Sequence, residues 1–184
     1  MAGIDEGRDV EAHLVVTEGE GIDGAAEYVR AARRGVGGAY RLAGCLLGGA
    51  TEAQDAVQDA LVKAWRSWST LRDPEAFEPW FDRIVVNVCR DRMRRHRTLR
   101  MVQLDAAGEV ESSDVFGSMV EGDEVAAAVA RLAPDQRIVI ALRYWRDLTL
   151  EQVAETLRLP LGTVKSRLHY ALRALRSELG GSER

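Results

Sequence analysis

The chain of 184 residues is short of cysteine, proline and aromatic residues: it holds 2 Cys and 4 Pro, and only 6% of its residues are Phe, Trp or Tyr. Cys45 and Cys89 lie in apolar helical surroundings, without a CxxC motif or a nearby group of histidines. A disulfide framework and a zinc site are therefore not supported, and both thiols are expected to be buried as small apolar side chains. No metal and no cofactor are expected.

Long apolar runs and catalytic motifs are also missing. No run approaches the roughly 20 residues that span a bilayer, and no signal peptide opens the chain, so we expect a cytoplasmic protein without a membrane segment of its own. His13, His96 and His169 are scattered. Residues 162–166 resemble part of a phosphate-binding loop but lack its upstream glycine and preceding strand. The sequence therefore predicts a protein that is not an enzyme.

Ala, Leu, Val, Arg and Glu dominate the composition, and no segment alternates apolar and polar residues as a strand does. This pattern favours an all-α protein of two small helical domains joined by a flexible acidic linker. The expected parts are an acidic disordered tail (1–24), a first domain (25–100), the linker (101–123), a second domain (124–179) and a short tail (180–184).

The net charge of −4 is distributed unevenly. Residues 1–27 carry eight acids and one base, whereas residues 83–100 carry seven arginines and one acid. A second acidic stretch, 105–124, has seven acids and no base, and residues 131–176 have nine bases and four acids. Because two basic modules alternate with acidic segments, the average charge does not argue against a nucleic-acid partner.

Residues 148–176 have the pattern of a helix-turn-helix. Thr149 can cap a first short helix, and Pro160 suits the first turn of a second one. One face of the second helix is apolar, and the other holds Thr163, Lys165, Ser166, Arg167, His169, Tyr170, Arg173 and Arg176. Such a helix fits the major groove of DNA, although a helical hairpin with a solvated arginine face has the same pattern.

The helix expected over 53–68 has the most regular apolar stripe in the chain. Trp65 belongs to this stripe and is expected to be buried, and Thr51 is the expected cap. The opposite face holds Gln54, Asp55, Gln58, Asp59, Val62 and Arg66. Taken alone, this face is best interpreted as an ordinary solvated surface.

Three further expectations concern where helices break, begin and bury a side chain. The helix that starts near residue 25 is expected to break or kink at Gly35, Gly37 and Gly38, because each glycine costs about 1 kcal/mol relative to alanine. In the second domain, Asp135 is expected to cap a helix, and Trp145 is expected on its buried face.

A helix starting near Pro79 is expected to bury one face and to expose a basic one. Steps of four and three residues align Arg83, Asn87, Arg90, Arg94 and Arg97 on the basic face. Such side chains can reach phosphates or base edges of a nucleic acid. A solvated arginine face is the alternative, but no glutamate stands four residues before these positions to compensate the charge.

Four motifs, in this order, resemble those of a known family. They are EAQDAVQDALVKAW (52–65), WFDRIVVNVCRDRMRR (80–95), LAPDQR (132–137) and GTVKSRL (162–168). With these motifs the chain resembles the extracytoplasmic-function (group 4) sigma factors of bacterial RNA polymerase, a branch of the sigma-70 family. The resemblance covers roughly residues 25–179.

The resemblance implies an alternative sigma factor that binds core polymerase and directs promoter-specific initiation. Its implied partners are the β′ clamp coiled coil and β flap of polymerase, promoter DNA and an anti-sigma factor. The residues implied to bind core polymerase are Asp55, Gln58, Asp59 and Val62. Those implied for the minus-ten element are Arg83, Asn87, Arg90 and Arg94, together with the loop 71–77. Those implied for the minus-thirty-five element are Thr163, Lys165, Ser166, Arg167, His169 and Arg173.

The sequence departs from the family pattern at four positions: Gln54, Ala56, Arg158 and Tyr170. Arg158 stands at a turn position that is often glycine in the family. A stand-alone helix-turn-helix regulator is the alternative function. Such a regulator needs no polymerase-docking face and would bind duplex DNA unaided.

Overall fold

The computed structural model describes residues 18–106 and 124–180, and within these ranges the chain forms helices and no strand. This confirms the all-α prediction. Residues 1–17 of the expected tail, 107–123 of the expected linker and 181–184 lie outside the described part. Residues 18–24, expected in the tail, belong to the first helix, and residues 101–106, expected in the linker, belong to the helix that ends at Ala106. The elements are α1 (Glu18–Leu47), α2 (Ala50–Arg66), η1 (Trp68–Thr70), η2 (Pro74–Ala76), α3 (Phe77–Ala106), α4 (Glu124–Arg131), α5 (Pro134–Ile140), the π-helical turn η3 (Ala141–Trp145), α6 (Leu150–Leu157) and α7 (Leu161–Gly180).

Helix α1 continues unbroken through its three central glycines, so the expected break there is wrong. A Cβ atom on Gly35 would lie 3.0 Å from the ring of Phe77, and one on Gly38 would overlap the guanidinium of Arg146. These two glycines therefore permit close approach by other elements, and the packing that they allow offsets their low helix propensity.

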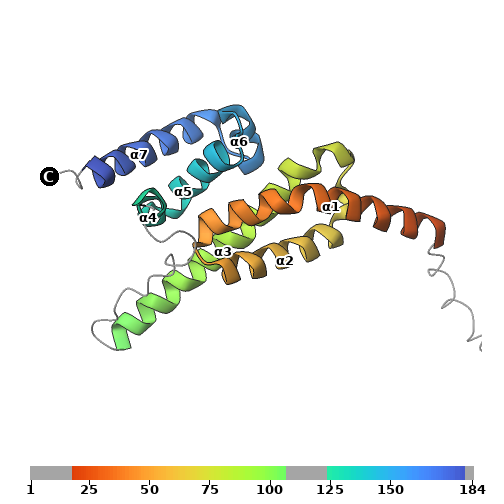
Figure 1. Ribbon diagram of the computed structural model, residues 1–184, viewed down its shortest axis with the longest axis horizontal. Coiled ribbons are helices and arrows are strands. Elements are labelled where there is room, and N and C mark those ends of the chain that lie inside the picture. The colour runs from red at the N-terminus through yellow and green to blue at the C-terminus, as the bar shows by residue number, and fades with distance from the viewer. Residues whose placement is uncertain (1–17, 107–123, 181–184) are drawn as a thin grey trace, which may run out of the picture.

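Helices α1, α2 and α3 lie side by side and form the first half of the molecule (Figure 1). Phe77 and Phe81 are fully enclosed between them, and the hydroxyl of Tyr28 donates a hydrogen bond of 2.7 Å to the carbonyl of Leu61. Helix α2 starts at Ala50 without a side-chain cap, so the expected Thr51 cap is wrong.

The second half comprises α4 to α7. Asp135 lies within the first turn of α5 and is not its cap, because the helix starts at Pro134 and the preceding Ala133 occupies the cap position. Trp145 is 39% exposed, against expectation, because α5 passes into the π-helical turn η3, which changes the direction of the side chains that follow.

The two halves share one hydrophobic core. Ile138, Leu142 and Val153 of the second half belong to the same buried cluster as Leu42 and Phe81 of the first. Helices α4 and α5 and the turn η3 contact α1, and α5 and α6 contact α3, which places the second half along one side of the first (Figure 1). The helical pattern predicted each half but not this contact between them.

Burial suppresses the chemistry of both cysteines. Cys89 is fully buried and Cys45 half-buried, and both are free thiols. Desolvation raises the pKa of each thiol to about 12. Both side chains therefore remain protonated at neutral pH and act in packing, as the sequence predicted for buried thiols.

The turn between α6 and α7 depends on a left-handed residue. Arg158 has φ 53° and ψ 47°, and this conformation lets the amide of Leu159 donate 2.9 Å to the carbonyl of Ala154. The hydrogen-bonded turn ends α6 in the manner that glycine usually provides.

We expect Arg158→Gly to stabilise the protein by about 0.5–1 kcal/mol, because glycine adopts the left-handed conformation without strain. Arg158→Ala is the matched control, since it removes the same charge and keeps the Cβ atom. Urea unfolding followed by circular dichroism measures both. Equal free energies of unfolding for the two variants would contradict the strain at Arg158.

Candidate nucleic-acid interface

The polar face of α2 is exposed along its whole length. Asp55, Gln58 and Asp59 are all exposed, and Val62 is 50% exposed. The Asp59 carboxylate accepts a hydrogen bond of 2.6 Å from Arg92 on α3. The face thus combines acids, an amide and an uncovered apolar side chain.

Trp65 joins this face, whereas the sequence predicted its burial. Its ring packs on Tyr28 at a centroid distance of 5.1 Å, yet 48% of the residue remains exposed. Helical periodicity gave its direction but could not show that α1 covers only one side of the indole. Exposed Val62 and Trp65 on one helix are typical of a protein-docking surface.

The basic stripe of α3 has two sides in the structure. Asn87 is exposed and lies towards α2, where it lines a pocket of about 370 Å³ together with Lys63, Arg66 and Ser67. Sequence reasoning did not assign Lys63 or Ser67 to a binding surface. Their convergence on Asn87 provides two cations and two uncharged polar groups, which is a suitable set for a nucleic-acid backbone and base.

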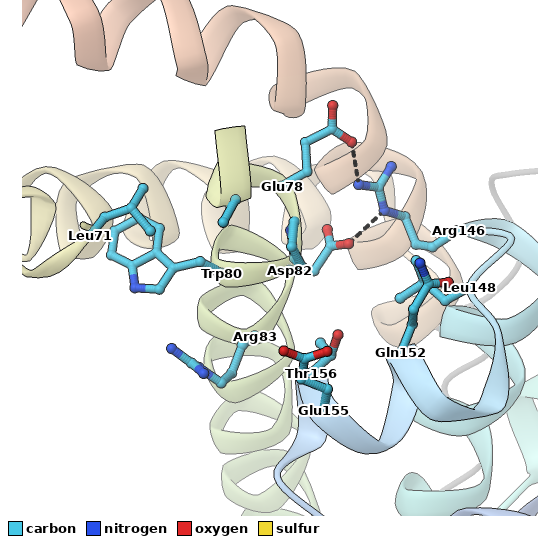
Figure 2. Close-up of a pocket in the computed structure, with 12 residues that line it drawn as sticks. Leu71, Glu78, Trp80, Asp82, Arg83, Arg146, Leu148, Gln152, Glu155 and Thr156 are labelled. Atoms are coloured by element: carbon cyan, nitrogen blue, oxygen red, sulfur yellow. Dashed lines mark hydrogen bonds and ion pairs between the residues drawn. The ribbon is translucent and has the colours of Figure 1, made fainter. Parts of the chain in front are cut away.

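Arg83 lies at the contact between the halves. It lines a second pocket, of about 430 Å³, whose other walls include Leu71, Trp80, Gln152, Glu155 and Thr156 (Figure 2). Desolvation, and then the charge of Arg158, lower the pKa of Arg83. Of the residues expected to contact DNA, Leu71 in the loop and Arg83 on α3 therefore lie in a pocket that α6 helps to line.

Three of the lining residues form ion pairs, Arg146 with Asp82 and with Glu78 (Figure 2). The Nε of Arg146 donates 2.8 Å to a carboxylate oxygen of Asp82, and its Nη2 donates 3.1 Å to Glu78. Asp82 is only 1% exposed, and its other oxygen has no hydrogen-bond partner.

Burial and pairing act in opposite directions on these two groups. Burial raises the pKa of Asp82, and the hydrogen bond and charge of Arg146 only partly offset this. Burial also lowers the pKa of Arg146, but hydrogen bonds to Asp82 and Glu78 and their charges outweigh it and raise the value overall. The desolvated carboxylate is the less well satisfied partner.

One carboxylate joins two of the predicted DNA contacts. Asp135 on α5 lies 3.6 Å from Arg90 on α3 and 2.8 Å from Arg167 on α7. Arg90 and Arg167 are accordingly half-buried, whereas Arg94 is exposed and pairs with Asp91 at 2.8 Å. The arginine stripe is therefore only partly available to a ligand.

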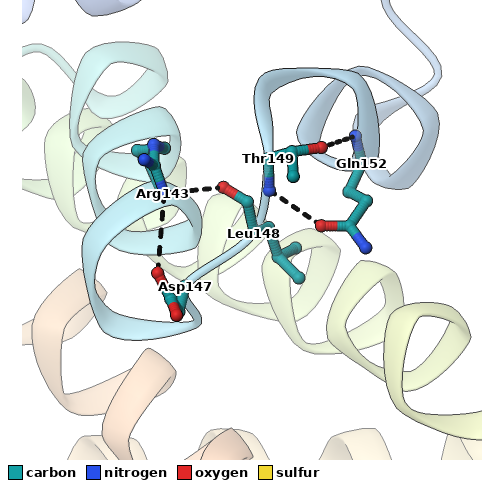
Figure 3. Close-up of polar contacts among 5 residues, drawn as sticks. All are labelled: Arg143, Asp147, Leu148, Thr149 and Gln152. Atoms are coloured by element: carbon teal, nitrogen blue, oxygen red, sulfur yellow. Dashed lines mark hydrogen bonds and ion pairs between the residues drawn. The ribbon is translucent and has the colours of Figure 1, made fainter.

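The helix-turn-helix is fixed by polar contacts before α6 (Figure 3). Thr149 and Gln152 form the predicted capping box, with hydrogen bonds of 3.2 Å and 2.8 Å. Arg143 donates 3.2 Å to the carbonyl of Leu148 and lies 3.6 Å from Asp147. These contacts orient α6, on which α7 packs.

The outer face of α7 presents most of the predicted contacts to solvent. Its exposed members are Lys165, Ser166, His169, Tyr170 and Arg173. The Ser166 hydroxyl donates 2.9 Å to the carbonyl of Thr163, and the His169 and Tyr170 rings lie 5.6 Å apart. Thr163 and Arg167 are half-buried. Lys165 and Ser166, near the helix N-terminus, are the best placed to reach base edges.

Among the side chains that the structure describes, in residues 24–98 and 124–180, no group of three His, Cys, Asp or Glu is arranged to hold a metal ion. None of the helices described is both long and apolar enough to cross a membrane.

Two family models match the chain. The family described as sigma-70 region 2 matches residues 29–98, and the family described as sigma-70, region 4 matches residues 128–177. The first falls on α1 to α3 and the second on α4 to α7.

Curated relatives and solved structures agree with these matches. The RNA polymerase sigma-E factor of Streptomyces coelicolor is 33% identical over 83% of this chain and 84% of the relative. The ECF RNA polymerase sigma factor SigL of Mycobacterium tuberculosis is 35% identical over 76% and 81%. The sigma factor RpoE of Bartonella quintana, solved in complex with the anti-sigma factor NepR, has a TM-score of 0.68 at 24% identity, over 83% of this chain and 96% of that one. CnrH, solved with the cytosolic domain of CnrY, has a TM-score of 0.61 at 23% identity, over 87% and 96%.

We expect Thr149→Ala to destabilise the second half by about 1 kcal/mol, because it removes the hydroxyl that accepts a hydrogen bond from the backbone N–H of Gln152. Thr149→Ser is the control, since it keeps a hydroxyl at the same position. Thermal unfolding measures both variants. A serine variant as unstable as the alanine variant would show that the methyl group, not the cap, is responsible.

Proposed function

Because the chain belongs to the extracytoplasmic-function sigma factors of the sigma-70 family, we propose that its exposed surfaces divide polymerase docking and promoter reading between the two halves. The chain is an alternative sigma factor, which directs promoter-specific transcription by RNA polymerase. Sigma factors are initiation factors and not enzymes. The proposal is carried by one observation: a single chain combines an exposed face of polar and apolar side chains on α2 with a helix-turn-helix.

The α2 face is proposed to bind the β′ clamp coiled coil of core polymerase. Asp55, Gln58 and Asp59 supply charge and hydrogen bonds, while Val62 and Trp65 supply apolar area that is uncovered in the free chain. Aromatic and aliphatic anchors surrounded by polar groups are typical of interface hot spots. The second half is proposed to contact the β flap.

The minus-ten element is proposed to bind across α3 and the end of α2. The Asn87 side chain offers a hydrogen-bond donor and an acceptor for a base edge. Lys63 and Arg66 beside it can neutralise the phosphates of the bound DNA strand. Arg83, Arg90 and Arg94 extend this cationic track along α3. A pocket for an extruded base beside a cationic track matches the requirements of single-strand capture.

The minus-thirty-five element is proposed to bind α7 in its major groove. The predicted contacts are Thr163, Lys165, Ser166, Arg167, His169 and Arg173. This chain shares its fold with RpoE and CnrH, whose structures were solved in complexes with NepR and with the cytosolic domain of CnrY. This likeness supports an anti-sigma partner for this chain too. The proposed place of action is the cytoplasm, where polymerase works.

Reconstituted transcription tests the proposal. Core polymerase with the wild-type chain is expected to yield run-off transcripts from members of a promoter library, while the chain alone does not retard the same promoters in a gel. A stand-alone regulator would give the opposite pattern, with retardation of duplex DNA by the chain alone and no transcription added to core.

The double variant Asp55→Ala and Gln58→Ala is expected to lower affinity for core by about tenfold or more, because it removes polar contacts at the centre of the docking face. Arg33→Ala, an exposed change on α1, is the control. Fluorescence anisotropy of labelled chains with core measures the affinity. Unchanged affinity of a folded double variant would remove α2 from the interface.

Lys165→Ala and Arg173→Ala are expected to weaken promoter binding in different ways. Loss of a base contact at Lys165 costs about 1–3 kcal/mol of binding free energy at one promoter position. Loss of a phosphate contact at Arg173 weakens binding to all sequences alike and reduces the slope of log affinity against log salt concentration by about one. Competition among single-base promoter variants measures the difference. Identical profiles for both variants would contradict the assignment of base reading to the N-terminal end of α7.

A further inference from the structure

The two proposed DNA-reading surfaces are joined to each other in this structure. Arg90 and Arg167 both contact the Asp135 carboxylate, at 3.6 Å and 2.8 Å. Yet the elements that they are proposed to read lie, by name, about 25 base pairs apart, or about 85 Å at 3.4 Å per base pair. Two arginines that share one carboxylate cannot reach both elements, so this arrangement is not the promoter-bound one.

A second contact holds the same closed arrangement. Arg146, from the second half, reaches Asp82 and Glu78 on α3. Its guanidinium also lies against Gly38 of α1, where the Cβ of any larger residue would be 2.7 Å from the central guanidinium carbon. Glycine inside a helix costs about 1 kcal/mol relative to alanine, and at Gly38 the contact with Arg146 offsets this cost. Gly38 provides the space that Arg146 occupies.

We propose that Arg146, seated on Gly38 and paired with Asp82 and Glu78, latches the two halves in a self-inhibited form in which Asp135 occupies Arg90 and Arg167 in place of DNA phosphate. This inference rests on the proposed function, because it takes those arginines as DNA contacts. In the closed form Arg83 also shares a pocket with Gln152, Glu155 and Thr156 of α6. Opening the latch frees Arg90 and Arg167 from Asp135 together.

Unsatisfied polar groups in the closed form favour its opening. Asp82 is enclosed with one oxygen unpartnered, and the Nε of Arg90 is buried without a hydrogen-bond partner. Both groups regain water when the halves separate. A buried ion pair whose groups are only partly satisfied contributes little net stability, because desolvation offsets the attraction. Core polymerase or DNA can therefore displace the intramolecular contacts.

A pair of glycine variants tests the latch in the full-length chain. Gly38→Ala places a methyl group where the Arg146 guanidinium lies, whereas Gly37→Ala, next to it on α1, meets only the far end of Arg41 at 3.8 Å. Both changes raise helix propensity equally. Spin labels on Arg33→Cys and Ser177→Cys report the separation of the halves, in a background in which the half-buried Cys45 is replaced by alanine. The thiol of Cys89 is fully buried and stays protonated, because burial raises its pKa.

We expect Gly38→Ala to lengthen the distance between the labels and to strengthen binding to a mixed-sequence duplex of about 30 base pairs by about fivefold or more, because the binding-competent fraction rises. Gly37→Ala should match the wild type in both measurements. An unchanged distance in Gly38→Ala overturns the latch. A longer distance without tighter DNA binding overturns the inhibition.

A pair of charge variants tests the role of Asp135 separately. Asp135→Asn frees Arg90 and Arg167, whereas Asp147→Asn removes the same charge from an exposed site in the same half, beside Arg143. Tighter duplex binding is expected for Asp135→Asn alone. An equal gain in both variants indicates only the change in net charge and overturns the competition. The label distances are measured without polymerase and therefore test the latch independently of the proposed function. If Gly38→Ala lengthens the distance but the wild-type chain supports no run-off transcription, the proposed function is wrong and the latch stands.

Discussion

The placement of the two halves depends on the burial of Asp82. A carboxylate that is 1% exposed requires a cation, and Arg146 is the group that reaches it, from the opposite half of the molecule. Without this pair, closing the halves would enclose an uncompensated charge, which costs several kcal/mol. The shared apolar core supplies the attraction between the halves, but the ion pair decides whether their surfaces can meet at all.

Charge works in this chain through competition between anions. Its arginines lie on surfaces suited to phosphate, yet Asp135 contacts two of them and Asp59 contacts Arg92. A carboxylate and a phosphate satisfy a guanidinium in similar ways. The net charge of −4 thus accompanies arginine-bearing surfaces, proposed to bind DNA, whose arginines are in part paired with the protein's own acids. Average charge says little about such a molecule; the pairing of each cation says more.

The sequence predicted what depends on neighbours along the chain. Periodicity located the helices, and the capping box at Thr149 followed from spacing alone. Periodicity could not show which directions another element covers, so Trp65 and Trp145 were expected inside and are partly exposed. The unbroken α1 has the same cause: Gly35 and Gly38 are explained by Phe77 and Arg146, which are distant in sequence. The joining of Arg90 to Arg167 likewise depends on how the halves meet.

The proposed closed form can be neither too stable nor too weak if the protein is to bind polymerase and promoter. A ligand shifts a two-state equilibrium only by its difference in affinity for the states, and each 1.4 kcal/mol of closure lowers the apparent affinity of core or promoter about tenfold. A fully satisfied interface would therefore weaken binding to polymerase severely, while an apolar contact alone would leave the arginines free to bind any nucleic acid. An enclosed carboxylate with one unpartnered oxygen lies between these limits. In the proposed latch, the imperfect pairing of Asp82 is thus what makes the covering of the proposed DNA-binding arginines reversible.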